Sequence, residues 1–294
     1  MNKKSIFLFL LLIPFLGFSQ QDLLYSKIAA LSKNMQGKVS VSASVIEDST
    51  NFGYYGDELC VIQSVFKYPI ALAILNKIDK GEFSLQHKMH VTPEFVRRYT
   101  FSMLRDSFYN GNINITFDKL IRYMVSYSDN IACDMLIHHL GKAKEVQKYL
   151  RKLGYEDVNI KYSEQQMSKK WENQYKNVCS PNTMVAILSD FFKGKILSQS
   201  STKYLYGVMC ETETGKNRMI KYLPKDTEIA HKTGSSGEKN GIMAAINDCG
   251  IIKLPNGKHL AAAIFVNDCK NSANDMEETI AKITLELYNY FSKL

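Results

Sequence analysis

Apolar residues occupy every second position between residues 39 and 45. This two-residue period predicts a strand that buries one face. A helix-like segment at residues 22–33 precedes the strand, and residues 52–56 form a second strand-like stretch after a turn. The chain is therefore predicted to open with a helix followed by a β-hairpin.

The middle of the chain repeats its apolar residues with the spacing of helices instead. Pro69 lies one turn inside the first predicted helix, where it is expected to kink the helix or weaken one hydrogen bond. The polar segment between Gly154 and Pro181 shows no period, and a loop of that length inside a compact domain is usually functional. The predicted helices span residues 64–80, 117–125, 131–140, 142–153 and 181–192.

Strand-like patterns return at the end of the chain. Residues 228–233 are predicted as a strand, and residues 243–252 and 260–266 as a hairpin about a Pro-Asn-Gly turn. The last segment, residues 274–291, carries apolar residues on one side of a helix.

This order of elements predicts an α+β fold with two lobes. Residues 20–58 and 210–294 would build an antiparallel sheet flanked by the terminal helices, and residues 59–209 an all-helical lobe. The active site is expected in the cleft between the lobes, where pockets commonly form.

The first residues follow the pattern of a secretory signal peptide. Lys3 and Lys4 precede an apolar run that ends near Ser19. The run is shorter than the roughly 20 residues of a membrane span. We therefore expect residues 1–19 to be cleaved, which gives a periplasmic or secreted protein without a stable membrane anchor. The alternative is an uncleaved anchor.

Composition narrows the classes of function further. Apolar residues make up 45% of the chain and charged residues 22%, as in ordinary globular proteins. The formal net charge is +8, but the positive residues are scattered, so no nucleic-acid partner is predicted.

The pattern of cysteine and histidine residues does not predict a metal site. The adjacent His138 and His139 would point about 100° apart on a helix, which makes them poor co-ligands. An even count of six cysteines permits disulfides in an exported protein. Cys249 and Cys269, on two strands predicted to be neighbours, are the candidate pair.

The sequence Ser64-Val65-Phe66-Lys67 is the first candidate for chemistry. At a helix start, residues three apart share a face, so Lys67 reaches the Ser64 hydroxyl. A serine hydroxyl becomes a good nucleophile when a neighbour takes its proton. Taken alone, such a pair is more often a solvent-facing coincidence.

Two further tripeptides follow in order, Ser128-Asp129-Asn130 and Lys232-Thr233-Gly234. Alone, the first reads as a helix–helix turn with Asp129 or Asn130 as the N-cap. The second reads as a turn at a strand end, where Gly234 would let another backbone or a ligand approach closely.

Together, the three motifs in this order are those of class A β-lactamases and penicillin-binding proteins. The whole mature chain resembles the class A serine β-lactamases, and the residues around Ser64 resemble the branch found in Bacteroidota, which includes extended-spectrum cephalosporinases. The resemblance implies the β-lactamase/transpeptidase-like fold, a monomer, and no cofactor. It also implies hydrolysis of penicillins and cephalosporins through a serine acyl-enzyme, which confers antibiotic resistance.

The resemblance assigns catalytic roles to the first two motifs. Ser64 would attack the lactam carbonyl and Lys67 would help to deprotonate it. Ser128 would relay a proton to the departing lactam nitrogen. Asn130 would hydrogen-bond the side-chain amide of the substrate.

The third motif would bind substrate. Lys232 and Thr233 would hold the substrate carboxylate, with Gly234 beside them. The backbone N–H of Ser235 would form the oxyanion hole together with that of the nucleophile. Ser235 and Ser236 would add hydroxyl groups beside the pocket, which fits a preference for cephalosporins.

Three positions outside the motifs complete the candidate site. Arg218 matches an arginine that supports the lysine–carboxylate contact in some members, and the alternative is a surface salt bridge. Glu164 would activate the deacylating water, with the loop acid Glu172 as the alternative. Ser168 replaces the usual Asn four residues after that Glu, and its hydroxyl would hold the water.

The loop around Glu164 departs from the usual family pattern. Gln165 stands where many members have Pro, and the ion pair that usually closes the loop would be replaced by Tyr162 and Asn177. Such a loop would widen the pocket for bulky cephalosporins. The alternative functions are a penicillin-binding D,D-peptidase, which lacks the deacylating Glu, and a covalent β-lactam sensor domain, which would be tethered to a membrane.

Overall fold

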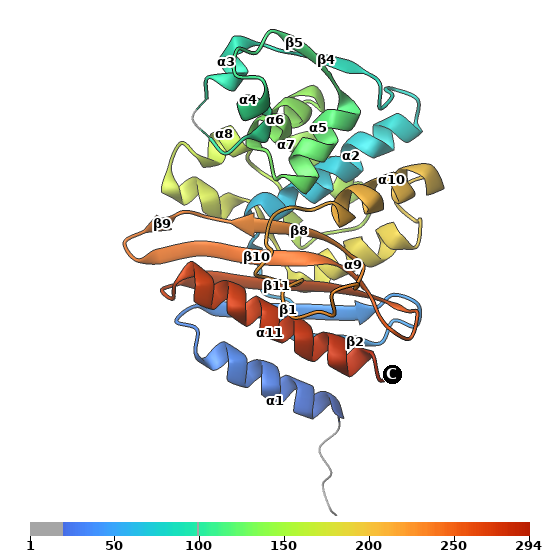
Figure 1. Cartoon of the computed structure of the whole chain (residues 1–294), viewed down its shortest axis with the longest axis vertical. Coiled ribbons are helices and arrows are strands. Elements are labelled where there is room, and N and C mark those ends of the chain that lie inside the picture. The colour runs from blue at the N-terminus through green and yellow to red at the C-terminus, as the bar shows by residue number, and fades with distance from the viewer. Residues whose placement is uncertain (1–19, 99) are drawn as a thin grey trace, which may run out of the picture.

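The computed structural model describes residues 20–98 and 100–294, so the predicted signal peptide at residues 1–19 lies outside the described residues. An antiparallel sheet occupies one half of the molecule and helices gather on the other side of it (Figure 1). The predicted α+β class is confirmed. Within the described ranges, no helix is both long and apolar enough to cross a membrane.

The sheet joins strands from both ends of the chain. Among the described residues it has six strands, in the order β2-β1-β11-β10-β8, with β9 paired to β10. In the register, Val41 lies opposite Ile264 and Ile246 lies opposite Ser235. The strands are β1 (Lys38–Val45), β2 (Asn51–Tyr54), β8 (Ile229–Ser235), β9 (Glu238–Lys239), β10 (Ile242–Lys253) and β11 (His259–Cys269).

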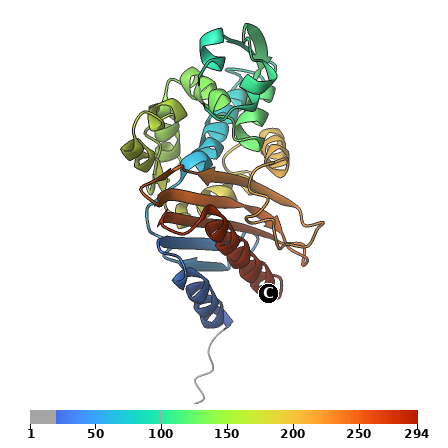
Figure 2. The same cartoon turned by 60° about the vertical axis from the view of Figure 1, so that its left-hand side comes forward.

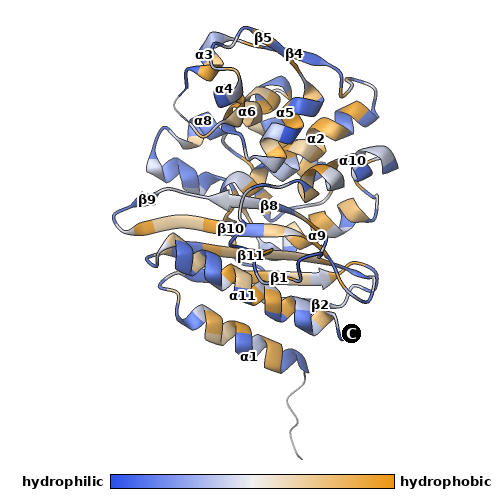
Figure 3. Cartoon of the chain, viewed as in Figure 1, coloured by the Kyte–Doolittle hydropathy of each residue, from blue (hydrophilic) through white to orange (hydrophobic). Residues whose placement is uncertain are grey.

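The terminal helices α1 (Gln20–Lys33) and α11 (Ala273–Phe291) lie side by side over one face of the sheet (Figure 2). Alternate strand residues, such as Ile264 and Val266, pack against them. The hydropathy view shows β10 and β11 largely apolar, while α11 mixes apolar and polar stretches (Figure 3). The two helices therefore seal the face with one apolar side each.

The opposite face of the sheet packs against the helical half. Ala261, Ala263 and Phe265 alternate with the residues of the first face and belong to this second core. Helix α2 (Lys67–Asp79) runs through its centre, with every residue from Lys67 to Leu75 buried. The helices around it are α5 (Phe117–Ser126), α6 (Asn130–His139), α7 (Ala143–Lys152), α9 (Pro181–Phe192) and α10 (Gln199–Cys210).

The half predicted as all-helical also contains short strands. β4 (Lys88–Val91) and β5 (Ile113–Thr116) form a hairpin, and β3, β7 and β6 form a small sheet. Runs of two to four residues are too short to show a period in the sequence. The remaining short elements are β3 (Cys60–Val61), β6 (Val158–Asn159), β7 (Val178–Cys179), α3 (Pro93–Val96), α4 (Met103–Ser107), α8 (Glu164–Met167), η1 (Gln63–Phe66) and η2 (Trp171–Lys176), the last two being 3-10 helices.

The expected position of Pro69, one turn inside a helix that begins at Ser64, is wrong. Residues 63–66 form the 3-10 helix η1, and α2 begins only at Lys67. Pro69 therefore lies in the first turn, where a backbone N–H has no partner within the helix and proline costs little.

The predicted pair Cys249–Cys269 is also wrong. Both residues lie on neighbouring strands, but the register places Cys249 opposite Ala263 and Cys269 opposite Met243. Six residues of extended strand separate their levels, roughly 20 Å, which is far beyond the reach of a disulfide. All six cysteines are free thiols in the structure.

Candidate active site

Ser64 and Lys67 meet because η1 runs directly into α2. In a 3-10 helix, side chains at positions i and i+3 eclipse, and Lys67 Nζ donates to Ser64 Oγ over 2.9 Å. Sequence spacing predicted this contact from an α-helical start, whereas the structure achieves it with the tighter helix. Lys67 is fully buried, so little water competes for its hydrogen bonds.

The Ser128-Asp129-Asn130 motif surrounds the same ammonium group from the connection between α5 and α6. Lys67 Nζ donates to Ser128 O over 2.7 Å and to Asn130 Oδ1 over 2.6 Å. Ser128 Oγ lies 3.3 Å from the same nitrogen. Ser128 has a φ of 57°, a left-handed conformation that costs energy for a non-glycine residue. Such strain commonly occurs at functional sites.

Asp129 holds this strained connection in place. Its Oδ1 accepts from the backbone N–H of Ala132 and caps α6, as expected from the sequence. Its Oδ2 accepts from Ser102 Oγ over 2.8 Å and from Leu104 N over 2.7 Å. The carboxylate is fully buried, so it positions the neighbouring serine and asparagine rather than meeting substrate.

Lys232 approaches the cluster from β8. Its Nζ donates to Ser128 Oγ over 3.0 Å and to Thr233 O over 2.9 Å. The side chain is fully buried, and burial together with the nearby Lys67 ammonium lowers the pKa of Lys232 to about 7. Ser128 Oγ therefore lies between two lysine side chains.

Gly234 allows β8 to approach η1. A Cβ on this residue would lie 2.4 Å from Ile62 O and 3.1 Å from Val65 N, so the expectation of a close backbone approach is confirmed. Thr233 Oγ1 lies 2.6 Å from Thr214 Oγ1. Sequence reasoning missed Thr214, because only the fold brings it beside β8.

Arg218 is buried beneath the same strand end and does not contact Lys232 directly. Its Nη1 donates to Gly234 O over 3.2 Å and to Asn247 O over 2.9 Å, and its Nη2 donates to Ser235 Oγ over 2.6 Å. Glu277 pairs with its Nε at 3.0 Å. The residue is 5% exposed, which excludes the alternative of a surface salt bridge.

Glu164 completes the cluster from the first turn of α8. Its Oε1 accepts from Ser64 Oγ over 3.2 Å and lies 2.8 Å from Lys67 Nζ. The other candidate acid, Glu172, is exposed and pairs with Lys239 at the surface. The structure therefore brings Glu164, and not Glu172, to the nucleophile.

Asp134 anchors the segment that carries Glu164, and sequence reasoning missed it. Its two carboxylate oxygens accept from the backbone N–H groups of Glu164 and Gln165, over 2.9 and 3.0 Å. The guanidinium of Arg98 pairs with the same carboxylate. Burial raises the pKa of Asp134. The sequence did offer one signal for Asp134, because this acidic residue lies one turn after Asn130 on the buried face of a predicted helix.

The loop that carries Glu164 has its two ends joined by the side chain of Asn177. This fully buried amide accepts from the backbone N–H groups of Lys161 and Tyr162 and donates to Tyr162 O over 2.8 Å. The contact between Tyr162 and Asn177 is thus present, but it uses the tyrosine backbone. A neutral amide replaces an ion pair at this closure.

Two predicted residues have their hydroxyl groups occupied elsewhere. Ser168 is exposed at the end of α8, and its Oγ donates to Gln165 O over 3.0 Å. Ser236 Oγ donates to Gly237 O and accepts from Ala245 N. The structure does not bring either hydroxyl to the Lys67 cluster, whereas the hydroxyl of Ser235 is held at the end of β8 by Arg218.

The described part of the chain contains no group of three or more His, Cys, Asp or Glu side chains arranged to hold a metal ion. A hydroxyl, a buried ammonium and a carboxylate lie within hydrogen-bonding distance of one another, as nucleophilic catalysis requires.

Comparisons with known proteins agree with this arrangement. A model of the beta-lactamase enzyme family matches residues 23–291. The beta-lactamase VEB-1 of Pseudomonas aeruginosa is 38% identical over 275 residues, which cover 93% of this chain and 92% of that protein.

Two solved structures have nearly the same fold as this chain. The TLA-3 extended-spectrum beta-lactamase has a TM-score of 0.91 at 38% identity and covers 92% of this chain and 99% of its own. A class A beta-lactamase from Bacteroides cellulosilyticus has a TM-score of 0.90 at 30% identity, with 95% and 100% covered. The chain therefore belongs to the class A beta-lactamase family.

Proposed function

We propose that the protein hydrolyses the amide bond of β-lactam antibiotics through an acyl-enzyme on Ser64. The observation that carries the proposal is the position of Ser64 Oγ, which contacts both Lys67 Nζ at 2.9 Å and Glu164 Oε1 at 3.2 Å. A nucleophile that contacts a lysine donor on one side and a carboxylate base on the other suits both the formation and the hydrolysis of an ester.

For acylation, the Ser64 hydroxyl donates to the Glu164 carboxylate in this arrangement, while Lys67 donates to both. The carboxylate is thus the acceptor for the serine proton, and the ammonium stabilises the developing charge. Ser128 Oγ, held between Lys67 and Lys232, passes a proton to the departing lactam nitrogen. The backbone N–H groups of Ser64 and Ser235 stabilise the oxyanion.

For deacylation, Glu164 takes a proton from the water that attacks the ester. This step distinguishes the proposed enzyme from a penicillin-binding protein, which acylates and stops. Lys232 and Thr233 bind the substrate carboxylate, and Asn130 binds the substrate amide. Arg218 orients Ser235 and the Gly234 carbonyl, so it supports the carboxylate site from below.

We extend the proposal to bulky cephalosporins. TLA-3 is described as an extended-spectrum enzyme, and the loop here closes with Asn177 and ends α8 with an exposed Ser168. A kinetic profile with strong preference for penicillins over oxyimino-cephalosporins would refute this extension.

The proposal also includes export and organisation. Residues 1–19 act as a cleaved signal peptide, and the mature monomer works in the periplasm or outside the cell. Its site lies between the sheet lobe (20–58 and 210–294) and the helical lobe (59–209). N-terminal sequencing of the exported protein and light scattering test these points.

The deciding experiment measures hydrolysis of a chromogenic cephalosporin by the mature chain and by two variants. We expect Ser64→Ala to be inactive and Glu164→Ala to accumulate an acyl-enzyme that intact mass detects. Glu172→Ala is the matched control and should turn over like the wild type. A wild-type protein that acylates once and stops would refute the proposal in favour of a penicillin-binding protein or sensor.

A further inference from the structure

Two cysteines face each other across the small sheet beside the active site. β3 pairs antiparallel with β7, and the register places Cys60 directly opposite Cys179. Directly opposed residues in such a pair have Cα atoms about 4.5–5.5 Å apart and side chains on the same face. Disulfides span Cα separations of about 4.4–6.8 Å, so the backbone geometry suits a cross-strand bond.

Both side chains point into the same core. Cys60 is 4% exposed and Cys179 is fully buried, and both belong to the core cluster on the helical side of the sheet. In the structure the Cys60 thiol lies against Ser40 and Cys179 Sγ donates to Ser180 O over 3.3 Å, so both thiols are free and would turn toward each other to form a bond.

The strand registers of the described residues offer no second pair of opposed cysteines. Cys249 lies opposite Lys232 on one side and Ala263 on the other. The remaining three cysteines are Cys133 on α6, Cys210 on α10 and Cys269 at the end of β11.

We propose that Cys60 and Cys179 form a disulfide in the exported protein. The inference rests on the proposed export, because disulfides persist in oxidising compartments. The two thiols lose two protons and two electrons to an oxidised dithiol reagent, either a protein disulfide or glutathione disulfide. One S–S bond forms in the protein, and the S–S bond of the oxidant is reduced to two thiols.

Burial of the two thiols favours their oxidation during folding rather than afterwards. Burial raises the pKa of Cys60 to about 11 and that of Cys179 well above its usual range. Because the thiolate is the reactive form, the folded thiols react slowly. The bond therefore forms while the strands are still assembling.

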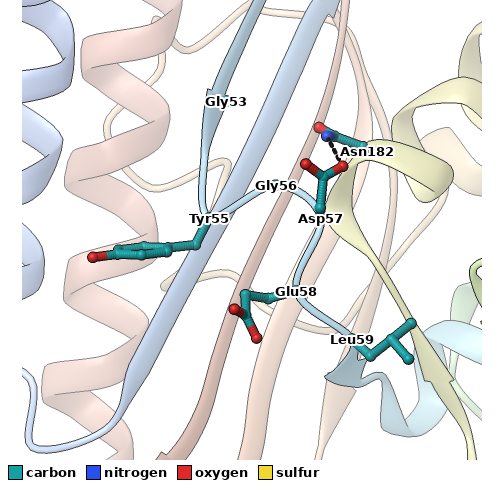
Figure 4. Close-up of a pocket in the computed structure, with 7 residues that line it drawn as sticks. All are labelled: Gly53, Tyr55, Gly56, Asp57, Glu58, Leu59 and Asn182. Carbon is teal, nitrogen blue, oxygen red and sulfur yellow. Dashed lines mark hydrogen bonds between the residues drawn. The ribbon is translucent and has the colours of Figure 1, made fainter.

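An open hollow of about 650 Å³ lies beside the chain neighbours of the pair, and none of its lining residues belongs to the Ser64 cluster (Figure 4). Leu59, which precedes Cys60, lines it with an exposed side chain, and Asn182, three residues after Cys179, lines its other side. In Figure 4 the segment Gly56–Leu59 passes along this hollow. Local opening of this segment is the route by which a small reductant would reach the bond.

The bond would brace the catalytic machinery at two points. Cys60 lies four residues before Ser64, and Cys179 follows the loop that carries Glu164. Between them, Ile62 N already donates to Asn177 O over 3.1 Å. The closed loop of residues 60–179 contains Ser64, Lys67, Ser128 and Glu164, so every proposed catalytic residue lies inside it.

The test is a peptide map of the exported full-length protein, alkylated under denaturing, non-reducing conditions. We expect a linked peptide containing Cys60 and Cys179, and an intact mass about 2 Da below that of the reduced protein. Free, alkylated Cys60 and Cys179, or a link from either residue to Cys249, would overturn the proposal. The mass readout is independent of β-lactam hydrolysis, so failure of the proposed activity is distinguishable from failure of this bond.

A stability comparison provides the second measurement. Reduction should lower the melting temperature of the wild type by roughly 5–10 °C, since the closed loop is long. Reduction should leave the double variant Cys60→Ser/Cys179→Ser unchanged. Cys210→Ser, at the exposed cysteine, is the matched control and should respond to reduction like the wild type. An equal response of wild type and double variant would overturn the proposal.

Discussion

The carboxylate of Asp134 offers the sharpest test of how the Glu164 segment is positioned. It is 5% exposed and accepts from two consecutive backbone N–H groups while it pairs with Arg98. The substitution Asp134→Asn keeps the shape of the side chain but offers one oxygen instead of two. Its NH₂ group must then face a backbone N–H, so one hydrogen bond is lost and two donors oppose each other.

The expected magnitude follows from these contacts. A hydrogen bond to a charged group contributes about 1.5–3 kcal/mol, and loss of the negative charge also leaves Arg98 without its ion pair. Because a displacement of roughly 1 Å costs on the order of 10²-fold in rate, deacylation should fall about 10- to 100-fold. Acylation should fall less, since Lys67 still contacts Ser64.

The assay is stopped-flow hydrolysis of a cephalosporin combined with intact mass at steady state. Asp134→Asn should accumulate acyl-enzyme. The matched control is Asp106→Asn, which alters an exposed carboxylate on α4 that pairs with Arg105. Wild-type turnover by Asp134→Asn, with no accumulated intermediate, would show that the loop does not depend on this anchor.

Three further predictions concern the β8 side of the site. Because the pKa of Lys232 is about 7, its cation is lost as pH rises through 7, and kcat/KM for a carboxylate substrate should fall above pH 7. A substrate esterified at the carboxylate should not show this fall in kcat/KM. Identical pH profiles for the two substrates would contradict the assignment. Gly234→Ala places a Cβ 2.4 Å from Ile62 O and should reduce hydrolysis by on the order of 10²-fold, whereas an unchanged rate would mean that β8 and η1 separate without consequence. Arg218→Leu removes the donor to Ser235 and leaves Glu277 unpaired. KM should therefore rise about tenfold or more, which corresponds to the loss of one hydrogen bond to a charged group. Steady-state kinetics in which only kcat changes would argue against a role of Arg218 in substrate binding.

Local signals in the sequence were sufficient for much of the fold. Helix Pro181–Phe192 has its predicted bounds because Ser180 caps it and proline occupies its first position. The hairpin of β10 and β11 was predicted from its turn, although both strands run longer. Helix α10 was missed, since polar residues and a glycine interrupt its apolar positions and leave no strong period.

The residues of the candidate site also fall into those that the sequence revealed and those that it did not. Ser64, Lys67, Ser128 and Lys232 were found because short motifs mark them. Asp134 was not, because the two backbone N–H groups that its carboxylate accepts from lie about 30 residues further along the chain. Motifs reveal groups that react, whereas groups that hold a loop in place become visible only when the fold supplies their partners.

The place of β1 in the sheet has a consequence for biogenesis. β1 lies between β2 and β11, and its pairing joins residue 38 to residue 267. Such long-range pairing slows folding. During synthesis, β1 has only β2 beside it until His259–Cys269 has left the ribosome. The sheet therefore cannot be completed until synthesis is almost finished, and under the proposed export this leaves the sheet half unfolded when the chain meets a translocation channel.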